Sequence, residues 1–328
     1  MVQLHIANGE VVFDITSLVT TITLSGDYQQ CARTLEFGLA SSATDGYLPR
    51  VSCELGNSVV LLDEGRTLFD GFVVTRQKGG GASAINVTCF DRGFYMRRNL
   101  ASYKFKNQTA DAVARRICKD FGIDIGELAA PGEKFSRNFL GSSLYDIVMT
   151  AYNLAGGEKK YIARFEGVKF CVREKRAGGD TLVIENGSNL LTVSCTESIQ
   201  NMVNKVLIYN EKDAVVKTLT KDEQIRQFGV LQSIVKQTED KKEAEKEAQK
   251  LLDENGIDQK VSITNLGDTS LITGGTVVVH EGFTGLYGLF YIDSDTHIWK
   301  NGTYTNRLVL NFRNIMDEKE VGELPDKK

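Results

Sequence analysis

The chain has 328 residues, of which 41% are hydrophobic and 25% are charged, and its formal net charge is −4. This length fits two or three domains, and the acidic balance disfavours a general binder of phosphate backbones. No apolar run approaches the ~20 residues that cross a bilayer, and the start lacks a secretory signal pattern, so we expect synthesis in a cytoplasm and no membrane contact. The 6 cysteines are scattered without a C-x-x-C pair, which predicts reduced, structural thiols.

The first part of the chain, residues 1–98, has the pattern of a β domain. Leu35, Phe37 and Leu39 occupy alternate positions along 34–39, which places the three side chains on one face of a strand. We therefore predict a first β-barrel-like domain over residues 1–98.

Residues 99–188 combine helix and strand patterns, and we predict a small α/β module here. Apolar spacing predicts one helix over 109–121 and a second that begins at Ser143, where Asp146 three residues later resembles a capping box. The side chains expected to point inward from the two helices are Ala110, Val113, Ala114, Ile117, Phe121, Leu144, Ile147, Val148, Ala151 and Leu154.

Strand patterns return in residues 189–316, which we predict to form a second β-barrel-like domain. One helix is expected at 239–254, and its thin apolar stripe predicts a peripheral helix on the outside of this domain. That stripe consists of Ala244, Ala248, Leu251 and Leu252. Residues 317–328 form a charged tail that we expect to be disordered. The predicted fold class is therefore α+β, dominated by strands.

Two stretches some two hundred residues apart, 59–72 and 276–289, are variations on one pattern. Each reads as an apolar strand, a Glu-Gly turn, a Thr, an apolar pair, and a Gly that opens another strand. Glycine tolerates the positive φ that tight hairpin turns need. The repeat favours two related β domains, and the alternative is two unrelated hairpins with the same turn chemistry. The residues that define it are Glu64, Gly65, Gly71, Glu281, Gly282 and Gly288.

The most suggestive cluster of ligand-type residues is Asp293, Asp295 and His297. They alternate along 291–299, so a strand places them on one face. Carboxylate and imidazole bind several divalent ions, but alternate residues of one strand lie about 7 Å apart, too far to share an ion without bending. We therefore predict no metal site and expect His297 to be a buried, hydrogen-bonded structural residue.

The sequence offers little support for catalysis. No G-x-S-x-G motif occurs, and no cysteine lies in a motif typical of a nucleophile. The 43 acidic residues leave a glycosidase-type carboxylate pair open, but no pair stands out. We predict no catalytic residue, no enzyme activity and no cofactor.

A basic stretch interleaved with aromatic residues lies between the first two predicted domains. Such a mixture is typical of single-stranded nucleic-acid surfaces. Because the chain is net acidic, a solvated domain junction or a patch that meets an acidic protein is the better interpretation, and we expect no DNA contact. The stretch consists of Arg92, Phe94, Tyr95, Arg97, Arg98, Tyr103, Lys104, Phe105 and Lys106.

Three carboxy-terminal segments, 197–206, 228–232 and 291–302, carry a family resemblance. They resemble the tail hub protein of contractile phage tails and phage-tail-like particles, the late control protein D type of Gram-positive prophages. Asn204, His297 and Gly302 lie in these segments. The middle of the chain fits as well, and the resemblance spans about residues 60–312; the matching pieces there are 91–92, 107–111, 143–147 and 165–170.

The resemblance implies a structural role in virion assembly. A homotrimeric hub with two β-barrel-like domains per subunit would present six similar domains to the sixfold tail tube and would seat the threefold spike. Its partners would be itself, the tube protein, the spike and other baseplate proteins. It would be made in the bacterial cytoplasm and incorporated in the baseplate of a contractile injection system, either a prophage tail or a tail-like bacteriocin.

A different class of protein is the alternative: a peptidoglycan hydrolase component of the same particle. Only a short charged segment follows Phe312, so we expect any lytic activity to lie on another protein.

Overall fold

The computed structural model describes residues 2–42, 45, 47–49, 51–79, 83–178, 181–237 and 241–325. It is a β-dominated α+β fold, as the sequence predicts. The prediction of two β-barrel-like domains is wrong for the described residues, because strands of both pair into one large sheet that does not close. The chain divides into two compact units, and the larger contains Met1–Val193 with Ser262–Lys328. The smaller, Ser194–Val261, is inserted within the span 189–316. No helix among the described residues is long and apolar enough to span a membrane.

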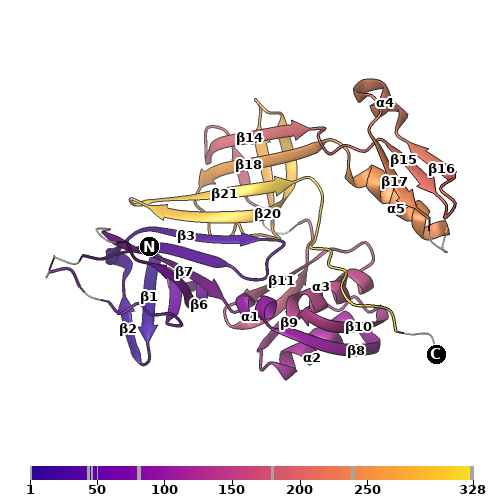
Figure 1. Ribbon diagram of the computed structural model, residues 1–328. Coiled ribbons are helices and arrows are strands. Elements are labelled where there is room, and N and C mark those ends of the chain that lie inside the picture. The colour runs from indigo at the N-terminus through magenta and orange to yellow at the C-terminus, as the bar shows by residue number, and fades with distance from the viewer. Residues whose placement is uncertain are drawn as a thin grey trace. The chain divides into compact units, whose positions relative to one another are not determined.

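The amino-terminal half of the larger unit forms one side of a large sheet (Figure 1). Its neighbouring strands pair in antiparallel fashion along the order β3-β4-β7-β6-β5-β1-β2. Leu35, Phe37 and Leu39 are buried on one face of β4, as their alternation predicts. The elements are β1 (Val2–Asn8), β2 (Val11–Asp14), a short 3-10 turn η1 (Thr16–Leu18), β3 (Val19–Asp27), β4 (Thr34–Ala40), β5 (Ser58–Asp63), β6 (Arg66–Gln77) and β7 (Ala84–Asp91).

The carboxy-terminal half continues the same sheet through a single strand pairing. Strand β20 pairs with β3 from Ser294↔Asp27 to Lys300↔Thr21, and the order then runs β20-β21-β18-β14. The first residues of β20 pair instead with β19, and β19 pairs in parallel with β13. These strands are β13 (Val183–Glu185), β14 (Leu190–Ser198), β18 (Asp258–Leu266), β19 (Thr276–Glu281), β20 (Leu286–Lys300) and β21 (Thr303–Asn311).

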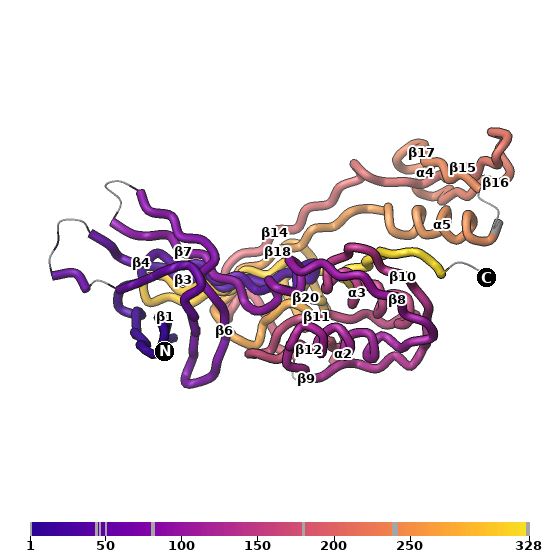
Figure 2. The backbone as a smooth tube through the Cα atoms, turned by 60° about the horizontal axis from the view of Figure 1, so that its bottom comes forward, coloured from indigo at the N-terminus to yellow at the C-terminus, as the bar shows by residue number. Residues whose placement is uncertain are grey.

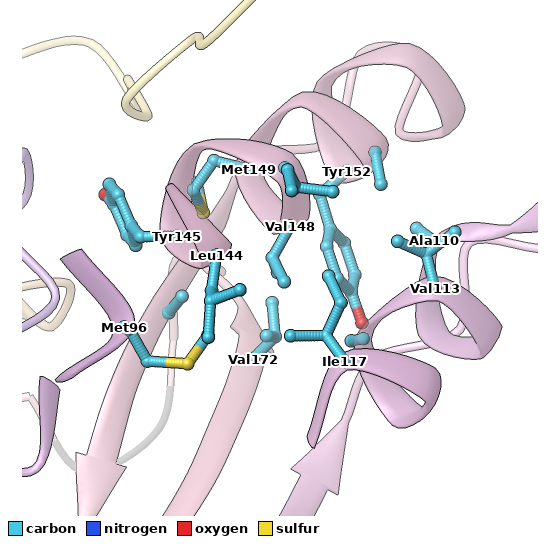
Figure 3. Close-up of a cluster of buried hydrophobic side chains, with 14 of the residues drawn as sticks. Met96, Ala110, Val113, Ile117, Leu144, Tyr145, Val148, Met149, Tyr152 and Val172 are labelled. Carbon is cyan, nitrogen blue, oxygen red and sulfur yellow. The ribbon is translucent and has the colours of Figure 1, made fainter. Parts of the chain in front are cut away.

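The middle of the chain forms the α/β module that the sequence predicts. Ser143 caps helix α3, because its hydroxyl accepts a hydrogen bond from the Asp146 amide at 3.0 Å. Figure 3 shows Val148 and Tyr152 of α3 directed toward Val172 and Ile117. The module contains α1 (Gly93–Arg98), β8 (Leu100–Thr109), α2 (Ala110–Asp120), β9 (Ile125–Leu128), β10 (Lys134–Ser143), α3 (Leu144–Ala155), β11 (Tyr161–Glu166) and β12 (Lys169–Glu174).

Two of the ten side chains expected inside this module are exposed instead. Phe121 is 40% exposed and Leu154 is 37% exposed, whereas the other eight are buried. Phe121 is the C-cap of α2 and Leu154 lies in the last turn of α3, where helical spacing no longer decides which face is covered.

The expectation of a disordered tail is wrong for residues 317–325. Met316 is part of the module core, and the Asp317 carboxylate accepts a hydrogen bond from the Tyr145 hydroxyl at 3.0 Å. Farther along, Glu323 and Asn138 exchange two backbone hydrogen bonds of 2.8 Å. The segment therefore runs along α3 and β10 (Figure 2). Its charge predicted solvation, but backbone bonds and one apolar anchor fix it to the module.

The smaller unit is a three-stranded sheet with one helix on one face (Figure 1). Its core joins three strand residues to three residues of α5, namely Val206, Ile208, Val235, Ala244, Ala248 and Leu252. The elements are β15 (Lys205–Tyr209), β16 (Val215–Thr220), α4 (Asp222–Phe228), β17 (Gln232–Lys236) and α5 (Lys241–Glu254).

The expectation of a peripheral helix is therefore wrong. Residues 239 and 240 of the predicted helix lie outside the described part of the chain, but α5 supplies half of the core of its unit. A stripe of two alanines and one leucine is sufficient because the sheet that it covers has only three strands.

The 6 cysteines are free thiols, as their spacing predicts, and 5 of them are buried.

Candidate assembly site

The face of β20 that the sequence singled out is buried. Asp293, Asp295 and His297 are at most 7% exposed. The Asp295 carboxylate accepts two hydrogen bonds from the Arg33 guanidinium, one of them at 3.0 Å, and two more from the Thr273 amide and hydroxyl at 2.6 Å each. Burial alone would raise the pKa of Asp295, but the Arg33 charge and the hydrogen bonds outweigh it and hold the pKa well below its ordinary value.

His297 lies beside this carboxylate in a fixed orientation. The Asn306 amide oxygen accepts from the Asp268 backbone amide at 2.6 Å, so its nitrogen faces His297 Nδ1 at 2.8 Å and donates to it. The other ring nitrogen, Nε2, lies 3.1 Å from Asp295 Oδ2. Among the described residues, no group of three or more His, Cys, Asp or Glu side chains is arranged to hold a metal ion.

The Arg33–Asp295 pair joins the two halves of the large sheet. Arg33 precedes β4 in the first half, and Asp295 lies in β20 where β20 pairs with β3. The pair also requires a glycine at position 26, since a Cβ there would lie 2.7 Å from an Arg33 nitrogen. Sequence reasoning missed both Arg33 and Gly26, and the only available signal was that a buried carboxylate needs a cationic partner.

A cavity of about 390 Å³ lies next to this network. Its arginines are mostly engaged within the molecule: Arg164 and Arg173 both donate to Glu166, and Arg33 donates to Asp295. Burial raises the pKa of Glu166, but the bonds from Arg173 and Arg164 outweigh it, so that the pKa is lowered. Arg33, Arg164 and Arg173 thus contribute to contacts within the fold.

The two repeated stretches both form hairpins, with different turns. Glu64 and Gly65 are the two residues of the first turn and both have positive φ, 48° and 81°. In the second hairpin Glu281 is the last strand residue, and four residues, 282–285, form the loop. When the two stretches are aligned on the Glu-Gly pair, their buried strand residues fall at positions that differ by one residue. Val59 and Leu61 are buried in the first stretch, and Val277 and Val279 are buried in the second.

The second glycine of each repeat also has a different setting. A Cβ at Gly71 would lie 2.3 Å from the Phe90 carbonyl oxygen, so the site tolerates no side chain. Gly288 has open space around it but a φ of 132°, so backbone conformation is its constraint.

Glu281 holds the loop of the second hairpin together. Its carboxylate accepts hydrogen bonds from the Thr284 hydroxyl, the Thr284 and Phe283 amides and the Asn186 side chain. These bonds lower its pKa to about 2, with the Thr284 hydroxyl as the largest cause.

We expect acid to loosen this loop before the sheet unfolds. A carboxylate whose pKa is depressed in the folded state contributes stability above its unfolded pKa, roughly 4.3, and loses it as the pH falls toward 2. The protection factors of the Phe283 and Thr284 amides should therefore fall between about pH 4 and pH 2, and Glu281→Gln should show low protection factors already at pH 6. Unchanged protection in that variant would contradict the role of Glu281.

The remaining motif residues hold turns. The Asn204 side chain donates to the Gly229 carbonyl at 2.8 Å and accepts from the Leu231 amide at 2.8 Å, which ties a loop of the smaller unit to β15. Gly302 follows Asn301 in the two-residue turn between β20 and β21, where both residues have positive φ.

The basic stretch is divided between side chains with internal contacts and exposed side chains. The Arg92 guanidinium lies over the Phe72 ring at 5.3 Å and 3.9 Å from Asp70, so this residue takes part in internal contacts. Lys104 and Lys106 are exposed on β8. The stacked Tyr103 and Phe105 rings pack against the module core instead of presenting open faces.

An exposed apolar patch on the second hairpin is the best candidate for an assembly contact. Val183, Val278 and Leu289 pair directly across β13, β19 and β20. Phe283 at the loop is 95% exposed and Tyr287 is 65% exposed. We call these five residues the apolar outer face. Contiguous exposed apolar side chains of this kind mark protein contacts.

A family model, described as YQBQ-like, matches residues 22–311. The chain belongs to the YQBQ-like family. A relative, the phage-like element PBSX protein XkdQ of Bacillus subtilis, is 25% identical over 308 residues, which cover 91% of this chain and 94% of that protein. The match agrees with the span on which the resemblance to tail proteins was based.

Solved structures show the same fold for this YQBQ-like chain. The 43 kDa tail protein of prophage MuSo2 from Shewanella oneidensis has a TM-score of 0.74 and 14% identity, with 97% of this chain and all of that chain covered. The E. coli c3393 protein, described as a type VI secretion component similar to T4 tail proteins gp27 and gp5, has a TM-score of 0.56 and 13% identity, with 94% of this chain and 76% of that chain covered. The resemblance to hub-type tail proteins is thereby confirmed for the fold.

Proposed function

We propose that this chain is a structural baseplate hub of a contractile phage tail or tail-like bacteriocin. The observation that carries the proposal is the likeness, over 97% of the chain, to the fold of a prophage tail protein. The absence of a catalytic constellation in the sequence agrees with an assembly role, and the cavity beside Asp295 is lined by ion pairs that are satisfied internally.

The hub proposal includes an adapter role. The two halves of the large sheet would act as the two related β domains of each subunit, so that three subunits offer six similar positions to a sixfold tube and a threefold seat to the spike. The repeated stretches support this idea because both form antiparallel hairpins, β5–β6 in the first half and β19–β20 in the second. The domain limits 1–98, 99–188 and 189–316 belong to the same proposal.

The apolar outer face is the surface that we assign to contact between subunits. A contact that is not related by a dyad repeats head to tail and closes into a ring when the rotation permits. Three subunits close the ring if each contributes two of six positions. Other baseplate proteins, the tube and the spike then bind the assembled ring.

Light scattering over a concentration series, with and without the spike protein of the particle, tests this proposal. We expect a species of three times the 36.3 kDa chain mass, and we expect Tyr287→Asp to abolish it because a carboxylate would be buried at the contact. The matched control is Leu140→Asp, an exposed leucine of the β10 strand. A stable dyad-symmetric dimer under all conditions would contradict the hub assignment.

A further inference from the structure

In the described part of the smaller unit, the face of the sheet opposite α5 carries exposed and partly exposed side chains. Helix α5 covers the face that carries Val206, Ile208 and Val235. The opposite face consists of three rows that run across β16, β15 and β17, as the strand registers show. The rows are Thr220–Lys205–Gln232, Thr218–Leu207–Ile234 and Val215–Tyr209–Lys236. We call these nine residues the open face.

The centre of the open face is apolar and incompletely buried. Ile234 is 56% exposed and Val215 is 49% exposed, and Leu207 and Tyr209 between them are partly exposed. Neighbouring exposed apolar side chains on one face of a sheet mark a site of protein contact. The composition therefore indicates that another element covers it.

Charge restricts what that element is. The only charged members of the open face are Lys205 and Lys236, at opposite ends of the apolar centre, and none of its nine residues is acidic. The turn beyond Tyr209 adds Glu211, Lys212 and Asp213 at the rim. A second open face is a poor partner, because it would place lysines at both ends against lysines. A complementary partner brings apolar side chains in the middle and carboxylates at both ends.

The dimensions restrict the partner further. Three strands about 4.8 Å apart and five residues long cover roughly 10 by 17 Å. That is far below the ~800 Å² per partner of a stable standard interface, so two copies of the chain would not be held together by it. It matches one helix, whose diameter with side chains is about 10 Å.

We propose that the open face docks one amphipathic helix of another tail protein. The helix places apolar side chains on Leu207, Tyr209 and Ile234 and carboxylates against Lys205 and Lys236. These lysines lie four residues and one strand apart, about 14 Å. The spacings near this length that return to the same face of a helix are about seven and about eleven residues, so we expect the two carboxylates at one of these spacings. That the partner is a tail protein rests on the proposed function.

Site-specific photo-cross-linking in purified tail particles tests the docking. Ile234 is replaced by the photo-cross-linker p-benzoylphenylalanine. The particle that contains this variant is irradiated, and the peptide linked to position 234 is identified by mass spectrometry. The matched control carries the same probe at Lys246, on the exposed side of α5. We expect Ile234 to link to one helical segment of another tail protein with acidic residues about seven or about eleven apart, and Lys246 to give no product.

Charge reversal gives a second measurement. Lys205→Glu with Lys236→Glu should lower the yield of that cross-link at least tenfold, whereas Lys246→Glu should leave it unchanged. Amide exchange of 205–209 verifies that the unit remains folded in each variant. Lys205 is partly exposed and Lys236 is exposed, and neither belongs to the core of the unit, so we expect the protection of these amides to remain unchanged.

Other outcomes overturn the inference. A cross-link from Ile234 to this chain's own residues, to a second copy, or to nothing at all in a particle that contains the chain defeats the docking and leaves the hub proposal intact. A particle that lacks the chain, by immunoblot, defeats the hub proposal, and with it the assignment of the partner to the tail.

Discussion

Asp295→Asn should destabilise the larger unit by about 3–5 kcal/mol, the usual cost of removing one partner from a buried ion pair. The substitution keeps the size of the side chain but leaves the Arg33 guanidinium, which is 14% exposed, without its counter-charge. Trp299 is the single tryptophan, lies in β20 and stacks on Tyr304 at 4.5 Å, so its fluorescence during urea unfolding reports on this region.

The pH dependence of this destabilisation tests whether loss of the Arg33–Asp295 ion pair causes it. Because the folded pKa of Asp295 is depressed, its contribution is complete above the unfolded value of about 3.9 and is lost as the pH falls below it. The difference between wild type and Asp295→Asn should therefore shrink below about pH 4. Glu185→Gln, an exposed carboxylate in β13, should change stability by no more than about 0.5 kcal/mol. A loss below about 1 kcal/mol for Asp295→Asn would show that the pair does not hold the halves together.

Leu252→Ala should destabilise the smaller unit by about 2–5 kcal/mol, the range for a buried leucine. Leu252 is 2% exposed and packs in a core of six buried residues, so the surroundings have few side chains that could fill the space. Hydrogen exchange of the β15 amides measures the effect on this unit alone.

The neighbouring leucine is the matched control for that experiment. Leu251 is only partly buried against the same core, and Leu251→Ala should cost clearly less. Equal losses at the two positions would mean that α5 packs differently from the arrangement described above. Small losses of stability at both positions would support the sequence-based prediction that this helix is peripheral.

Much of the local structure is readable from the sequence because it depends on neighbours along the chain. Periodicity predicts the inward faces of α2 and α3 and the alternation in β4. Cap and turn chemistry predicts the Ser143 cap and the turn at Glu64 and Gly65. The family resemblance also came from short segments, and it is confirmed for the fold.

Similar sequence did not guarantee similar geometry in the repeated stretches. The same Glu-Gly pair forms a two-residue turn in one hairpin and closes the strand before a four-residue loop in the other. The difference depends on where the carboxylate finds donors: Glu281 has Asn186, 95 residues away, as well as its own loop. A pattern of residues cannot reveal a partner that only the fold brings close.

The sequence by itself determined the β-dominated class, the presence of helices α2, α3 and α5, the turn at Glu64 and Gly65, the buried setting of His297 and the family. Only the tertiary structure decided that Arg33 meets Asp295 across 262 positions, that residues 317–325 lie on the module, and that 194–261 form a unit with α5 in its core. The physical reason is the range of the interactions. Hydrophobic period and backbone propensity act over one turn or one strand, whereas burial of a charge or a thin apolar stripe depends on which distant surface covers it.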